Sequence, residues 1–248
     1  MADLFVAVDP GPAGAPRVVL IHGSLDRSTA FLRVARELQD LTVIRFDRRG
    51  YGRSLAVGAS TSFDDQVSDL ASVVGDEPAI VVGHSLGGIV GLTFASRHPE
   101  LAPAVVAYEA PMPWLPTWPS NTAGGMAVAS GDDGDAAEAF MRRIVGDDRW
   151  EALPPRTKAQ RRAEGPALVA ELRSLRPPNP APYDPATFPV PVVAGHGGQS
   201  RPHHQEAARA LARSVPCGEL VVIEEASHGA HLTHPREFAG LVRRALGR

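Results

Sequence analysis

The chain has 248 residues, a net charge of −3, and a composition of 44% hydrophobic and 21% charged residues. This composition fits one large α/β domain, or one domain with an insertion, and supplies a sizeable core. The balanced charge excludes nucleic acid and a membrane surface as expected partners, and no apolar run approaches the roughly 20 residues that span a bilayer. A single cysteine, Cys217, excludes an internal disulfide framework. The N-terminus lacks the basic start and apolar stretch of a signal peptide, so we expect a cytoplasmic protein.

Short apolar runs alternate with helical patterns through the first 110 residues. The expected strands are 17–21, 41–46, 79–82 and 104–108, and the expected helices are 29–38, 66–74 and 86–97. Strands without polar alternation are those covered on both faces, as in a parallel sheet. The pattern therefore predicts an α/β fold with a doubly wound, mostly parallel sheet.

The alternation stops at 111–187, which is rich in proline and glycine and has helical patterns at 135–145 and 158–174. It resumes with expected strands at 190–194 and 220–223 and expected helices at 204–214 and 235–246. We therefore predict a core made of 1–110 and 188–248, with a small helical cap insertion at 111–187 over the C-terminal edge of the sheet.

Ser85 is the predicted nucleophile. It lies in the pattern Gly-His-Ser-Leu-Gly at 83–87, between an expected strand and an expected helix. In a Gly-x-Ser-x-Gly elbow the serine occupies a strained turn that projects its oxygen above the sheet. The alternative is a glycine-rich phosphate turn, but the sequence has no Gly-x-Gly-x-x-Gly after the first strand and no Gly-Lys-Ser/Thr.

Three segments in register, 18–24, 47–54 and 83–88, together resemble the α/β-hydrolase superfamily, and the resemblance extends from about residue 16 to the C-terminus. It implies the α/β-hydrolase fold, with an oxyanion hole formed by the backbone N–H groups of Ser24 and Leu86. A serine at the elbow also excludes the haloalkane dehalogenase and epoxide hydrolase chemistry of relatives that use aspartate there.

His228 is the predicted general base among nine histidines. It follows the last expected strand among small residues, where the resemblance places a base that takes the serine proton and returns it to the leaving group. His203 and His204 begin a helix and are expected at the surface. The side chains expected to line the substrate pocket are His22, His84, Trp114 and His196.

His228, His231 and His234 form a His-x-x-His-x-x-His run that raises the alternative of a metal site. Pro235 interrupts any helix there, and no helical frame or supporting carboxylate is evident. We therefore expect no metal and no cofactor.

Glu109 is the predicted acid of the triad. The loop after the strand 190–194 has no carboxylate before Glu206, so it lacks the late aspartate of many superfamily members. The resemblance offers a second position at the end of the strand after the nucleophile, and Glu109 lies there. A buried carboxylate also needs a partner. Glu224 and Glu225 are nearer to His228 in sequence, but they are expected to be exposed strand-end charges.

These residues predict a serine hydrolase that cleaves an ester, lactone or thioester through an acyl-enzyme. The expected substrate is a small to medium, partly apolar molecule. Two alternatives stay open: the same triad used for C–C hydrolysis, perhydrolysis or a biosynthetic lyase or cyclisation step, and a non-enzymatic ligand sensor that has kept the elbow.

Overall fold

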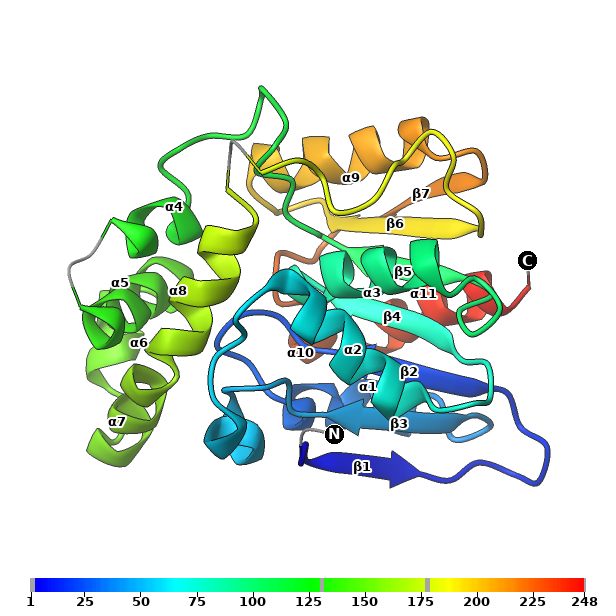
Figure 1. Cartoon of the computed structure of the whole chain (residues 1–248), viewed down its shortest axis with the longest axis horizontal. Coiled ribbons are helices and arrows are strands. Elements are labelled where there is room, and N and C mark those ends of the chain that lie inside the picture. The colour runs from blue at the N-terminus through cyan, green and yellow to red at the C-terminus, as the bar shows by residue number, and fades with distance from the viewer. Residues whose placement is uncertain (1–2, 130–131, 177–178, 248) are drawn as a thin grey trace.

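A seven-stranded sheet forms the centre of the protein in the computed structural model, which describes residues 3–129, 132–176 and 179–247 (Figure 1). The strand order is β1-β3-β2-β4-β5-β6-β7, with β1 antiparallel to β3 and the other pairs parallel. The strands are β1 Val6–Asp9, β2 Arg17–Ile21, β3 Thr42–Phe46, β4 Ile80–His84, β5 Val105–Tyr108, β6 Val192–Gly197 and β7 Gly218–Ile223. The predicted doubly wound, mostly parallel sheet is confirmed.

Helices cover both faces of this sheet, because alternate strand residues point to opposite sides. Val19 and Val81 pack with α2 (Phe63–Val74), α3 (Leu86–Arg97) and α9 (Pro202–Ser214). Val18 and Val82, their neighbours along the same strands, pack with α1 (Leu32–Arg36) and α11 (Pro235–Leu246). Every residue of β4 is buried, as expected for a central strand between two helical layers.

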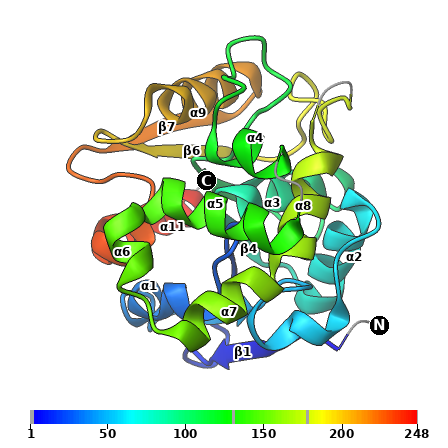
Figure 2. The same ribbon diagram turned by 90° about the vertical axis from the view of Figure 1, so that its left-hand side faces the viewer.

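Five further helices lie between β5 and β6 in the chain, all within the predicted insertion. They are α4 Ala123–Val128, α5 Asp133–Val145, α6 Asp147–Glu151, α7 Pro155–Ala163 and α8 Gly165–Ser174. They gather beside one end of the parallel strands, on the left of Figure 1, and this layer faces the viewer in Figure 2. Ala136, Ala137 and Leu168 form a separate apolar cluster that includes Tyr51 of the core. We refer to this layer, α4–α8, as the cap.

Two elements differ from the sequence prediction. The strand β1 was not predicted, because its residues pair at the sheet edge and leave Val6 and Val8 exposed. The helix expected over 158–174 is two helices, α7 and α8. Pro166 in the first turn of α8 explains the break, since a proline inside a continuous helix would remove one backbone hydrogen bond and clash with the preceding turn.

Four short helical segments were also not predicted: η2 (Gly52–Val57), α4, α6 and α10 (Ala230–Thr233). The helix expected over 29–38 is η1 (Ser28–Phe31) followed by α1. Among the described residues, none of the helices is both long and apolar enough to cross a bilayer.

Candidate active site

Ser85 occupies a sharp turn between β4 and α3. Its backbone is in the left-handed region, with φ 52° and ψ −125°, and its N–H donates to the carbonyl oxygen of Tyr108 at 2.8 Å. The turn requires glycine on both sides. A Cβ at Gly83 would collide with the backbone of Gly87, and a Cβ at Gly87 would collide with the backbone at the end of β2. The local sequence thus allows a turn that carries the Ser85 hydroxyl above the sheet.

Glu109 and His228 come together from the ends of β5 and β7. Glu109 Oε2 lies 2.7 Å from His228 Nδ1, and the glutamate is fully buried. The other carboxylate oxygen accepts the Gly197 N–H at 2.9 Å and a hydrogen bond from the Ser200 hydroxyl. Both oxygens therefore have donors, which offsets the cost of burying the carboxylate.

These contacts determine the protonation of the pair. Burial alone would raise the pKa of Glu109, but the hydrogen bond and the charge of His228 lower it to about 2. An ionised carboxylate can only accept a hydrogen bond, so His228 Nδ1 carries the proton in this contact. The lone pair of a neutral His228 is then on Nε2, the nitrogen that a general base would use.

Three aromatic side chains hold His228 and its loop in place. Tyr108 Oη donates to the Ser227 carbonyl at 3.0 Å, and His84 Nε2 donates to the His228 carbonyl at 2.8 Å. The His204 ring is stacked on the His228 ring, with centroids 4.6 Å apart and an interplanar angle of 24°. Burial first, and then the charge of His228, lowers the pKa of His204 well below its usual range, so His204 is neutral near pH 7.

The segment after β2 lies directly against the elbow. A Cβ built on Gly23 would be 3.0 Å from the Cβ of Ser85, so glycine permits this close approach. Ser24, the next residue, lines the same cavity as Ser85, and its hydroxyl donates to Glu171 of the cap helix α8 at 2.5 Å. The segment predicted to supply an oxyanion donor is thus tied to both the elbow and the cap.

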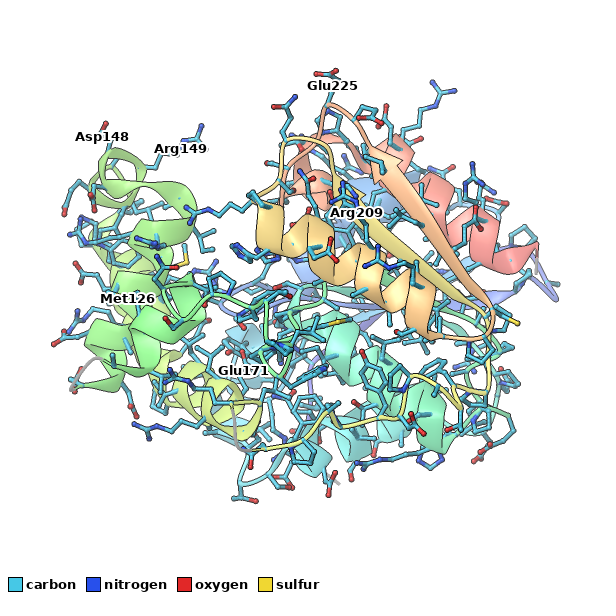
Figure 3. All side chains as sticks on the ribbon, turned by 90° about the horizontal axis from the view of Figure 1, so that it is seen from above. Met126, Asp148, Arg149, Glu171, Arg209 and Glu225 are labelled. Atoms are coloured by element: carbon cyan, nitrogen blue, oxygen red, sulfur yellow. The ribbon has the colours of Figure 1, made fainter. Side chains whose placement is uncertain are left out.

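Glu171 is the centre of a fully buried polar cluster between the cap and the core. Its Oε1 accepts the Tyr51 hydroxyl at 2.6 Å, and its Oε2 lies 2.7 Å from Arg48 Nη1. Gln66 donates to Oε2 at 3.3 Å. Burial alone would lower the pKa of Arg48, but the charge of Glu171 raises it, so the Arg48 guanidinium stays charged. Figure 3 shows Glu171 at the junction between the cap helices and the sheet.

Backbone strain is concentrated at this site. Among the described residues other than glycine, positive φ occurs at Leu25, Ser85 and Glu109, with values of 53°, 52° and 49°. Leu25 follows the predicted oxyanion residue, and the other two are the predicted nucleophile and acid. Left-handed backbone at non-glycine residues costs free energy and clusters where function requires a particular geometry.

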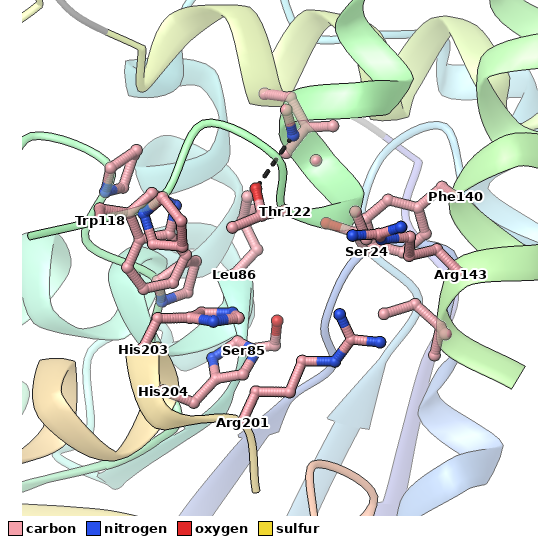
Figure 4. A pocket seen from close by; sticks show the side chains of 18 of the residues that line it. Ser24, Ser85, Leu86, Trp118, Thr122, Phe140, Arg143, Arg201, His203 and His204 are labelled. Atoms are coloured by element: carbon pink, nitrogen blue, oxygen red, sulfur yellow. Dashed lines mark hydrogen bonds between the residues drawn. The ribbon is translucent and has the colours of Figure 1, made fainter.

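A cavity of about 820 Å³ lies between the core and the cap (Figure 4). The core contributes Ser24, Ser85, Leu86 and His228 to its lining. Apolar side chains cover much of the cap side, among them Val128, Phe140, Ile144 and Leu172. The cavity is large enough for a small to medium, partly apolar ligand at Ser85.

The four side chains predicted to line the pocket lie outside this lining. His22 is buried and its Nε2 accepts the Arg48 N–H, while His84 supports the His228 loop. Trp114 packs edge-on against Tyr183, and His196 is buried in β6. All three histidines are buried at or just after strand ends, with side chains directed into the protein rather than into the cavity.

The sequence interpretation missed two other groups of lining residues. His203 and His204, expected at the surface, line the cavity together with Trp118 of the cap segment. The four arginines Arg143, Arg173, Arg176 and Arg201 line it as well. The available signal was the position of His203, His204 and Arg201 directly after β6, at the same sheet edge as the nucleophile.

Two groups of side chains have the spacing of metal ligands. Asp26, His84 and His231 form one group, and Glu109, His204 and His228 the other, with ligand atoms within 4.8 Å of one another. Hydrogen bonds account for a contact in each group: His231 Nε2 lies 3.1 Å from Asp26, and His228 Nδ1 lies 2.7 Å from Glu109. The sequence run of three histidines does not converge, since His234 pairs with the Thr233 hydroxyl.

A serine on a sharp strand–helix turn and a histidine–carboxylate pair beside one cavity form the arrangement expected of a serine hydrolase. The family model described as the alpha/beta hydrolase family matches residues 18–241. The chain belongs to that family, and it is a hydrolase.

Two bacterial enzymes are among the relatives that this chain resembles in sequence. The chain is 31% identical over 244 residues to a pimeloyl-[acyl-carrier protein] methyl ester esterase of Chromobacterium violaceum, covering 90% of this chain and 91% of the relative. It is 32% identical over 165 residues to lipase LipV of Mycobacterium tuberculosis, covering 65% of this chain and 58% of the lipase. The match to the lipase thus spans somewhat more than half of that protein.

Solved structures share the fold at lower identity. The enol-lactonase of Burkholderia xenovorans LB400 superposes with a TM-score of 0.75 at 20% identity, covering 99% of this chain and 96% of the enol-lactonase. A thermophilic esterase from Thermogutta terrifontis superposes with a TM-score of 0.75 at 22% identity, covering 98% of this chain and 93% of the esterase.

Proposed function

We propose that the protein hydrolyses carboxylic esters, lactones or thioesters through an acyl-enzyme on Ser85. The observation that carries the proposal is the hydrogen bond between Glu109 and His228 at the edge of the cavity that Ser85 lines. The printed activities of the relatives, a methyl ester esterase and a lipase, agree with this reaction type.

In the first step Ser85 Oγ attacks the carbonyl carbon while His228 Nε2 takes the hydroxyl proton. Glu109 holds His228 by Nδ1 and stabilises the imidazolium that forms. The backbone N–H groups of Ser24 and Leu86 face the oxygen that becomes negative. His228 then gives its proton to the leaving alcohol or thiol, and the acyl-enzyme remains.

In the second step His228 takes a proton from water, and the resulting hydroxide attacks the acyl carbon. The proton returns to Ser85 Oγ as the acid leaves, so the free enzyme is restored. The cap forms one side of the cavity in which these atoms react.

Ser85→Ala tests the nucleophile. Wild type should hydrolyse short p-nitrophenyl esters and react with a fluorophosphonate probe, whereas Ser85→Ala should lose both, with a rate lower by about a factor of 1,000 or more. Ser120, another lining serine, provides the matched control Ser120→Ala, which should keep probe labelling. A wild type that neither turns over esters nor takes up the probe would overturn the proposal in favour of a ligand sensor.

Glu109→Gln tests the acid. The amide keeps the size of the side chain but removes the charge that stabilises the His228 imidazolium, so kcat should fall by a factor of about 100 to 10,000. Glu224→Gln, a change at the exposed carboxylate nearer to His228 in sequence, is the control and should stay close to wild type. An unchanged rate in Glu109→Gln together with a loss in Glu224→Gln would assign the acid to Glu224.

A further inference from the structure

The charged side chains that line the cavity are basic, although the protein has a net charge of −3. Arg143, Arg173, Arg176 and Arg201 line it, and no aspartate or glutamate in the described part of the chain does so. The acid of the predicted triad, Glu109, is fully buried behind His228 and is bonded on both oxygens. The space beside Ser85 is therefore positively charged.

Arg201 is the arginine that the fold places next to the predicted triad. It directly follows Ser200, whose hydroxyl donates to Glu109, and it directly precedes α9. The Arg201 carbonyl accepts the His204 N–H at 3.0 Å, and this bond fixes the Arg201 backbone at the start of α9. In Figure 4 its side chain extends past Ser85 toward the side of the pocket where Phe140 and Arg143 lie.

The guanidinium groups in the cavity also lack acidic partners. Within the described ranges no carboxylate forms an ion pair with Arg143, Arg173, Arg176 or Arg201, and Arg143 donates only to the Asn121 carbonyl. The neighbouring cap residue Arg142 differs, since it pairs with Glu138, Asp147 and Glu151 on the outer surface. The arginines that face the cavity are thus left available to a ligand.

A guanidinium presents its N–H groups in a planar fork that matches a carboxylate. Arg143, Arg173 and Arg201 are exposed and Arg176 is partly buried, so a ligand carboxylate would meet them where water still reaches the cavity. The rest of the cap lining is largely apolar. A singly charged carboxylate costs less to transfer into such a pocket than a doubly charged phosphate. The ligand that suits this lining has an apolar chain and one carboxylate.

We infer that the substrate is an ester that carries a second, free carboxylate, and that Arg201 binds this group while Ser85 attacks the ester. The inference rests on the proposed ester hydrolysis and adds the substrate class. The apolar chain between the two groups lies against the cap, so that the cavity selects its length.

Two esters of equal chain length test the inference. Monomethyl adipate has a free carboxylate, and dimethyl adipate has none. For wild type, kcat/KM should be at least about 10-fold higher for monomethyl adipate, mainly through a lower KM. Added NaCl should raise the KM of the charged ester and not that of the neutral one, because salt screens the ion pair. Equal or better use of dimethyl adipate would overturn the inference while leaving ester hydrolysis intact.

Arg201→Gln should reduce the ratio of the two kcat/KM values by about 10-fold. Arg149→Gln is the matched control, since Arg149 lies on the outer surface of the cap and should keep the wild-type ratio (Figure 3). An unchanged ratio in Arg201→Gln would exclude Arg201 as the carboxylate partner.

Binding to Ser85→Ala separates a failure of the inference from a failure of the proposed function. Calorimetry on this variant needs no turnover, and it should show tighter binding of monomethyl adipate than of dimethyl adipate. Tighter binding in the absence of turnover by wild type would support the charged pocket and reject the hydrolysis. Equal binding of the two esters would reject the charged pocket.

Discussion

Glu109 combines three properties that rarely occur together in one residue. It is fully buried, it is ionised with a pKa of about 2, and its backbone has φ 49°. The left-handed backbone turns the side chain at the end of β5 toward β6 and β7, where Gly197 and His228 supply its donors. These donors, together with the Ser200 hydroxyl, offset the free energy cost of the strain and burial.

The lowered pKa of Glu109 predicts a pH dependence of stability. The ordinary pKa of this carboxyl is 4.5 and the folded value is about 2, so the folded state binds fewer protons between these values. The stabilisation is present above about pH 4.5 and is lost as pH falls toward 2. Relative to Glu109→Gln, wild type should lose up to about 3 kcal/mol of unfolding free energy across this range, measured by urea denaturation. Parallel pH curves for the two proteins would contradict the lowered pKa.

Short-range sequence information was enough to predict that Ser85, His228 and Glu109 lie near one another, because a strand end determines which sheet edge a residue occupies. It was not enough for Arg201 and His204. Arg201 directly precedes α9 and His204 lies in its first turn, where sequence alone does not decide between solvent and the neighbouring loop. His204 is turned inward because its ring stacks on His228, a contact between residues 24 positions apart in the chain.

At the scale of elements, strands and helices with strong periodic patterns were predicted closely, and α3 and α11 begin and end where expected. The cap was predicted as a helical region but not in detail. Its helix α7 has no buried residue, so it lacks the apolar stripe from which a helix is recognised in sequence. The polar contacts of α8 with the core depend on tertiary structure.

The contact of Glu171 with Arg48 predicts how firmly α8 is attached to the core. Glu171→Gln removes the charge opposite a fully buried arginine, and breaking such a pair costs about 3 kcal/mol or more. Glu138→Gln, on the outer cap helix α5, is the matched control because Glu138 pairs with Arg142 at partly exposed side chains and should cost about 1 kcal/mol or less. Urea denaturation measures both losses, and equal losses would show that the buried cluster does not stabilise the protein.

At the scale of the whole molecule, the sheet and the cap perform separate tasks. The residues proposed as nucleophile, base and acid follow the ends of β4, β7 and β5. The cap supplies much of the apolar lining and Arg143 and Arg173, and Arg176 lies in the segment that follows α8. The sheet thus carries the proposed catalytic geometry, while the cap together with Arg201 of the core carries the choice of substrate. Changes in the cap should alter the choice of substrate more than the chemistry.

Val128→Trp tests this division by filling the cap side of the cavity. Val128 lies on α4 and lines the cavity of about 820 Å³, so a larger ring there should exclude long acyl chains before short ones. The ratio of kcat/KM for p-nitrophenyl octanoate to that for p-nitrophenyl acetate should fall by about 10-fold or more. Met126→Trp is the matched control, because Met126 lies on the same helix with 51% exposure and outside the cavity lining (Figure 3). If both variants change the ratio equally, or neither does, the acyl chain binds elsewhere than against α4.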